Sequence, residues 1–182
     1  MSLLGPVDLP WREDPASGRV PASFRLLQER FLHPAGCVVT DIEREPESAE
    51  YGAIRFRLGG QACVYRQAKH TPKKVGQFVT VWKRPTPSAD IAPFDREDGI
   101  ERVFVFADEQ ARFGVFVFPV QQLLEQAIFS ERSEGGKRAF RVYAPWTEPE
   151  AAQARRSKKW QCRHFVELTD EEAGRLQLAR LL

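Results

Sequence analysis

Two kinds of apolar spacing alternate along the chain and predict a mixture of helices and strands. A two-residue period marks a strand with one buried face, and a period near 3.6 residues marks a helix. Strands are predicted at residues 37–42, 51–58, 61–69, 102–106, 113–118, 138–143 and 161–168. Helices are predicted at 22–33, 119–127, 148–159 and 170–182, the last capped by Thr169. We therefore expect an α+β fold with a mixed, mostly antiparallel sheet flanked by helices.

The glycine pair Gly59-Gly60 lies between two strand-like runs and predicts a two-residue hairpin turn. Such a turn determines which residues of the two strands oppose each other. With no bulge, the pairing continues outward until Gly52 opposes Gln67 and, two pairs further, Glu50 opposes Lys69. Opposed residues lie on the same face of a sheet. The side chains of Glu50, Gln67 and Lys69 are therefore expected to gather at the open end of the hairpin.

The segment after this hairpin fits a helix that starts at Thr71-Pro72, with Thr71 as N-cap and Pro72 as the first helical residue. Apolar residues then recur at the i, i+3, i+4 and i+7 spacing of a helix. These residues are Val75, Phe78, Val79 and Trp82. The helix would expose Lys73, Gln77, Thr80 and Arg84 on its other side. A strand at 78–83 is the alternative, because residues 79–81 are β-branched.

The length of 182 residues suits one domain, predicted here at 21–182 after an irregular N-terminal arm at 1–20. No apolar run approaches the roughly 20 residues of a membrane helix, and from the first residues we expect no signal peptide. Three widely separated cysteines suggest free thiols in a reducing compartment. We therefore expect a cytoplasmic protein that does not enter a membrane.

Positive charge is concentrated in two parts of the chain. Residues 66–84 contain six Lys or Arg and no Asp or Glu, and residues 137–163 contain eight basic and two acidic residues. Such a surface attracts anions, so DNA or RNA is the expected partner. The candidate contacts are Lys73, Lys74, Gln77, Lys83, Arg84, Lys137, Arg138 and Arg141. An acidic protein partner and an ordinary solvated surface are the alternatives.

The chain resembles the MepB-like family of bacterial proteins over residues 50–166. The resemblance rests on the segments 66–74, 77–84, 116–119, 137–143 and 159–161. Two positions differ from the family's pattern: Gln67 stands where a Glu is expected, and Ala144 where a Pro is usual. The resemblance implies a bacterial cytoplasmic setting and no settled activity.

The hairpin end also resembles, more weakly, the core of PD-(D/E)xK nucleases, with helices and strands in the order αβββαβ. In that comparison Glu50 and Gln67 would bind Mg²⁺, and Lys69 would position the attacking water. The neutral amide of Gln67 is a poorer metal ligand than a carboxylate, so we expect weak or absent hydrolysis. A simple ion pair between Glu50 and Lys69 is the alternative interpretation. No zinc-ligand spacing, nucleophile elbow or phosphate-binding glycine loop indicates another class of enzyme.

Overall fold

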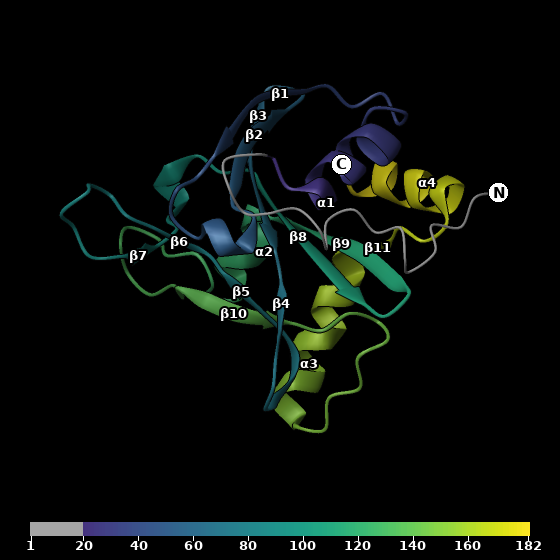
Figure 1. Cartoon of the computed structure of the whole chain (residues 1–182). Helices are drawn as coiled ribbons and strands as arrows, with labels where there is room; N and C mark the ends of the chain where they lie inside the picture. Colours follow the sequence, from purple (N-terminus) through teal and green to yellow (C-terminus); the bar gives the residue numbers. More distant parts are fainter. Residues whose placement is uncertain (1–19) are drawn as a thin grey trace.

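A six-stranded sheet lies at the centre of the computed structural model, which describes residues 20–182 (Figure 1). Its strands lie in the order β1-β2-β3-β8-β9-β11. Only β3 and β8 pair in parallel, and the other neighbours in this sheet are antiparallel. The strands are β1 (Val39–Arg44), β2 (Ile54–Leu58), β3 (Gln61–Gln67), β8 (Arg102–Glu109), β9 (Arg112–Pro119) and β11 (Phe165–Glu167).

A second sheet of three strands, in the order β10-β5-β4, is entirely antiparallel. These strands are β4 (Lys69–Thr71), β5 (Lys74–Thr80) and β10 (Ala139–Val142), and β6 (Trp82–Lys83) pairs with β7 (Ala92–Pro93). The helices are α1 (Ala22–Leu27), α2 (Val120–Glu125), α3 (Ala152–Gln161) and α4 (Glu171–Leu181). A π-helical segment, Gln28–Leu32, extends α1. The expected α+β domain with a mostly antiparallel sheet is confirmed, and the N-terminal arm lies outside the described residues.

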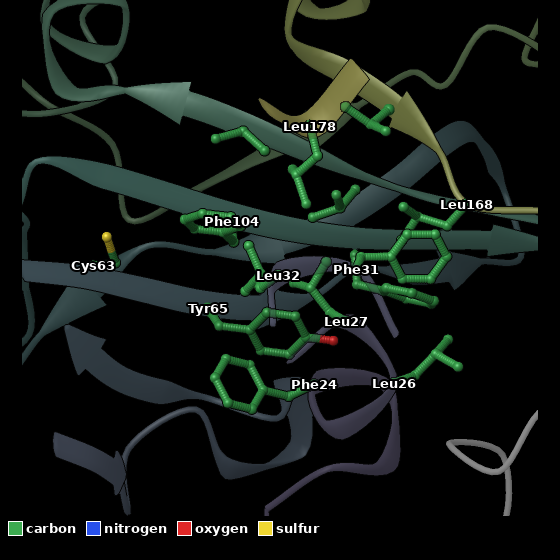
Figure 2. Close-up of a cluster of buried hydrophobic side chains, with 14 of the residues drawn as sticks. Phe24, Leu26, Leu27, Phe31, Leu32, Cys63, Tyr65, Phe104, Leu168 and Leu178 are labelled. Carbon is green, nitrogen blue, oxygen red and sulfur yellow. The ribbon is translucent and has the colours of Figure 1, made fainter. Parts of the chain in front are cut away.

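Two hydrophobic clusters cover the two faces of the large sheet. One joins the sheet to α1, its π-helical extension and α4, and Figure 2 shows Phe24, Tyr65, Phe104 and Leu178 within it. The other joins the opposite face to β5, β10 and α2. Successive residues of β3 enter alternate clusters, as the two-residue period of a strand requires: Val64 belongs to one and Tyr65 to the other. No helix among residues 20–182 has the length and apolar character needed to cross a membrane.

The hairpin at Gly59-Gly60 has the expected register near its turn, where Leu58 pairs with Gln61 and Ile54 with Tyr65. The ladder does not continue to Glu50. Strand β2 begins at Ile54, and residues Ala49–Tyr51 instead form a short 3-10 helix. The predicted pairing of Glu50 with Lys69 is therefore wrong, because Lys69 has left the large sheet and pairs with Phe78.

The predicted helix at residues 71–84 is also wrong, and the strand alternative holds. Strands β4 and β5 form a hairpin there, and β6 follows. Val79 and Val81 are buried in the core, whereas Val75, which the helical stripe would bury, is 52% exposed. Gly76 has a φ of +82°, and Tyr143 packs so closely on it that a side chain would collide with the ring. Without this helix the chain lacks the αβββαβ order of the nuclease comparison.

Two further boundaries differ from prediction. The C-terminal helix is capped by Asp170, whose carboxylate accepts a hydrogen bond from the N–H of Ala173 at 3.0 Å, and not by Thr169. The strand expected at 161–168 is confined to β11, because α3 continues to Gln161 and a 3-10 turn follows it. Both changes leave the order of the C-terminal elements as predicted.

The side chain of Arg66 is buried inside the second cluster, with only 1% of its surface exposed. Its Nη2 lies 2.6 Å from a carboxylate oxygen of Glu45, which also pairs with Arg55. Nη1 donates to the carbonyl of Tyr65 at 2.9 Å, and the ring of Phe94 lies 5.6 Å from the guanidinium carbon. Burial lowers the pKa of Arg66, and the charge of Glu45 opposes that shift. The pair joins β3 to the connection between β1 and β2.

Removing the carboxylate of Glu45 should therefore destabilise the fold strongly. Glu45→Ala leaves a buried guanidinium without its counter-charge, which costs about 3–5 kcal/mol in comparable buried pairs. Chemical denaturation measures this as a lower free energy of unfolding. The matched control is Glu43→Ala, because Glu43 is exposed on β1 and should shift stability by less than about 0.5 kcal/mol. Equal effects of the two substitutions would show that the pair does not support the fold.

Candidate nucleic-acid interface

A row of three side chains crosses the outer face of the small sheet. The register places Lys69 of β4 and Arg141 of β10 opposite Phe78 of the central strand β5, so all three share one face. Val79, the next residue of β5, is buried on the opposite face, in the core. Phe78 is therefore directed away from the core, and it is half-buried.

Two aromatic rings lie between two cations in this row. The Arg141 guanidinium lies 5.8 Å from the centre of the Phe78 ring, and the ring of Tyr51 lies 6.2 Å from that of Phe78. The ammonium of Lys69 lies 4.7 Å from the centre of the Tyr51 ring. We call Lys69, Tyr51, Phe78 and Arg141 the cation–aromatic row. It combines positive charge with the faces of two aromatic rings.

Arg141 also fixes the shape of the β4–β5 hairpin. Its guanidinium donates to the carbonyl of Gly76 at 2.9 Å and to the hydroxyl of Thr71 at 2.6 Å. Arg141 thus ties both strands to β10, whereas the backbone ladder joins β10 directly to β5 alone. This arrangement holds the charge of Arg141 at a defined position beside Phe78.

The turn of the same hairpin carries Lys73 and Lys74, both exposed. They line a cleft of about 430 Å³ together with Trp146. Two carboxylates, Glu109 and Glu148, also line this cleft. Glu148 is paired with Lys158 at 2.9 Å. The two lysines at the turn extend the positive charge of the cation–aromatic row toward the end of the hairpin.

The predicted helix placed Gln77 on its exposed side, but in the structure Gln77 is buried. It is 4% exposed, and its Nε2 donates to the carbonyl of Asp108 at 2.6 Å and lies 2.8 Å from Nε2 of His70. His70 is also 2.8 Å from the same carbonyl. Gln77 therefore holds the small sheet against the end of β8, and this corrects its expected place on an exposed surface.

Three other predicted contacts are held within the protein. Lys83 pairs with Asp98, and Arg84 pairs with Glu47 at 2.8 Å. The side chain of Arg138 donates to the carbonyl of Ile91 at 3.0 Å. These interactions place the three cations around the β6–β7 hairpin and neutralise two of them. Lys137 is exposed and lies apart from the row, in a cleft between β10 and α3.

The residues expected to bind Mg²⁺ do not fit a metal. The Oε1 atom of Gln67 accepts a hydrogen bond from the hydroxyl of Ser23 at 3.2 Å, and that hydroxyl also accepts one from Tyr65 at 2.6 Å. Glu50 lies on the exposed 3-10 turn and would be the single carboxylate of the site. In the described part of the chain no three His, Cys, Asp or Glu side chains form a group suited to a metal. Mg²⁺ prefers carboxylates in octahedral geometry, so a single carboxylate and an occupied amide are poor ligands.

Sequence reasoning missed the aromatic members of the row. The strand alternative for residues 78–83 would have predicted the outward direction of Phe78. Successive residues of a strand point to opposite faces, and the next residue, Val79, is buried. The helical interpretation placed both residues in one apolar stripe. Tyr51 joins the row from the 3-10 turn through its ring contact with Phe78. The local sequence pattern around either residue does not predict this contact.

The comparisons with known proteins agree with this fold. A family model described as MepB-like matches residues 45–167. A solved structure titled "Crystal Structure of MepB" is similar with a TM-score of 0.69 and 30% sequence identity, covering 72% of this chain and 88% of that one. A comparison with curated proteins finds no match. The chain belongs to the MepB-like family.

Proposed function

We propose that this protein binds nucleic acid through the cation–aromatic row and the two lysines at the β4–β5 turn. The observation that carries the proposal is the row itself, in which Lys69, Phe78 and Arg141 face away from the core on neighbouring strands. Stabilisation of the sheet alone does not require an aromatic ring that lies half-exposed between two cations. The row offers groups for phosphates and for bases on one surface.

The cations supply the phosphate contacts in this proposal. Lys73 and Lys74 are exposed, and the segment 66–84 that contains them has no carboxylate of its own. Binding of phosphates by lysine releases counterions, so the affinity falls as salt rises. Such contacts position a nucleic acid without selecting a sequence.

The aromatic rings favour a single strand over a duplex. Bases of single-stranded DNA or RNA stack on exposed aromatic side chains, and one base contributes about 1–3 kcal/mol. Bases within a duplex are stacked on each other and do not present their faces. Phe78 and Tyr51, whose ring centres are 6.2 Å apart, can therefore act on a single strand and not on intact double helix.

The first test compares a double lysine variant with a charge-matched control. Lys73→Ala with Lys74→Ala should weaken binding of a labelled oligonucleotide and reduce the slope of log affinity against log salt by about 1.4, near 0.7 per contact. Arg25→Ala with Arg180→Ala removes two exposed cations from α1 and α4, on the far side of the large sheet, and should leave the slope unchanged. Fluorescence anisotropy at several salt concentrations gives both values. Equal slopes for the two variants would place the phosphate contacts elsewhere.

The second test concerns stacking. Phe78→Leu keeps an apolar side chain of similar reach but removes the ring, so affinity for a single strand should fall about 5- to 150-fold, the equivalent of one lost stacking contact. Affinity for a duplex of the same length should stay within about two-fold. Thermal unfolding confirms that the variant is folded. A similar loss for both substrates would assign Phe78 a structural role.

The third test concerns hydrolysis, which we propose to be weak or absent. Glu50 is the single carboxylate among the three residues of the nuclease comparison, and the Gln67 oxygen accepts a hydrogen bond from Ser23. Wild-type protein should therefore leave an end-labelled oligonucleotide intact with Mg²⁺ through a long incubation. Lys69→Ala serves as the control for a contaminating nuclease, which would act equally in both preparations. Cleavage by the wild type that disappears in Lys69→Ala would contradict this part of the proposal.

A further inference from the structure

The free edge of β10 is open to an additional strand. β10 is the outer strand of the small sheet, in the order β10-β5-β4. The N–H of Val81 donates to the carbonyl of Arg138 at 2.9 Å, which identifies Arg138 as a residue whose backbone faces β5. In an antiparallel pair such residues alternate with residues whose backbone groups face the other way. Ala139, Arg141 and Tyr143 therefore direct their N–H and C=O groups away from β5.

Part of this edge is already occupied by a side chain that imitates a strand. Gln161 of α3 donates from Nε2 to the carbonyl of Arg141 at 2.8 Å and accepts from the N–H of Tyr143, also at 2.8 Å. Gln161 is 1% exposed. Its amide makes the two bonds that a peptide group of a neighbouring strand would make. The N–H and C=O of Ala139 and the N–H of Arg141 remain on the same edge.

These remaining groups border a cleft of about 360 Å³ between β10 and α3. The wall formed by α3 includes the short side chains of Ala154 and Ser157, which leave space beside the strand. Lys137 and Arg141 line the cleft, and among residues 20–182 none of the lining residues is an Asp or Glu. The cleft therefore combines a strand edge with positive charge.

We propose that this edge binds an extended, acidic segment of a partner protein, which adds to β10 as a short strand. Alternating backbone donors and acceptors along an edge match the backbone of a peptide, and addition of a strand is a common mode of peptide recognition. Lys137, together with a lining that has no Asp or Glu in the described part of the chain, favours carboxylates in the segment. Gln161 ends the available edge, so the added strand pairs over about three or four residues. This site shares Arg141 with the cation–aromatic row, but it uses the backbone of that residue and does not depend on nucleic-acid binding.

The probe is a fluorescein-labelled peptide of alternating valine and glutamate, seven residues long, measured by fluorescence anisotropy. Two derivatives carry N-methyl groups on alternate backbone nitrogens, one at the valines and one at the glutamates. A strand bonds through one edge, so one derivative should lose at least ten-fold in affinity and the other should bind nearly as the parent does. A peptide with lysine in place of glutamate should bind at least ten-fold more weakly.

A substitution in the protein tests the same edge. Ala139→Pro removes the N–H that faces the cleft and leaves the bonds between β10 and β5, since proline is accepted on a strand edge. It should weaken peptide binding at least ten-fold, whereas the control Ala139→Val should change it by less than three-fold. Hydrogen exchange of wild-type protein should show slower exchange at the amides of Ala139 and Arg141 once peptide is bound. The peptide and exchange measurements decide the question even where the proline variant does not fold.

Three results would overturn the proposal. The first is equal binding of the parent peptide and both N-methylated peptides, which would reduce the interaction to charge alone. The second is protection of the Ala139 and Arg141 amides by an oligonucleotide and not by the peptide. The third is protection in the protein alone that increases with protein concentration, which would assign the edge to a second copy of this chain.

Discussion

The buried ion pair between Arg66 and Glu45 connects the large sheet to the segment that covers part of the small one. Arg66 lies on β3, and Glu45 directly follows β1, where its N–H also bonds to the carbonyl of Ala53 at 2.9 Å. Between these two residues the chain forms the 3-10 turn that carries Tyr51. A buried charge without its partner is costly, so the pair restricts the path of residues 45–53. Tyr51 of the cation–aromatic row lies within this restricted segment.

The same segment contacts the small sheet a second time. The hydroxyl of Ser48 accepts a hydrogen bond from Thr80 at 2.9 Å, and both side chains are buried. Thr80 and Phe78 lie on one face of β5, so Ser48 covers one end of that face and leaves Phe78 partly exposed. The surface proposed to bind nucleic acid is thus bounded by contacts that also stabilise the fold.

The free edge of β10 lies on another side of the same small sheet, beside α3. One sheet can in this way present two separate binding surfaces.

Local patterns predicted the parts of the fold that local physics determines. The glycine pair at 59–60 predicted the hairpin and its register near the turn, and the phenylalanine-rich runs predicted β8 and β9. The segment at 71–84 was ambiguous because Val75, Phe78, Val79 and Trp82 fit a helical stripe while Val79 and Val81 also fit a strand. Pairing with β10, some 60 residues later, decides in favour of the strand. No local pattern contains that contact.

The candidate site was predicted only in part for the same reason. The excess of positive charge at 66–84 pointed to the β4–β5 hairpin, where Lys73 and Lys74 are exposed. Partners distant in sequence then changed the roles of other residues, since Glu47 and Asp98 pair with Arg84 and Lys83, and Asp108 holds Gln77. The burial of Arg66 likewise depends on Glu45, 21 positions earlier in the chain. Charge in a sequence predicts attraction for an anion, but the fold decides which cations remain on the surface.

The most direct measurement of the central claim is an NMR titration of isotope-labelled protein with a single-stranded oligonucleotide of about ten bases. If the cation–aromatic row binds nucleic acid, backbone amide shifts will concentrate in β4, β5 and the 3-10 turn at Ala49–Tyr51, and the aromatic signals of Phe78 and Tyr51 will move upfield as bases stack on them. Shifts confined to other surfaces, such as α1 and α4 on the far side of the large sheet, would contradict the account. So would unchanged spectra at low salt.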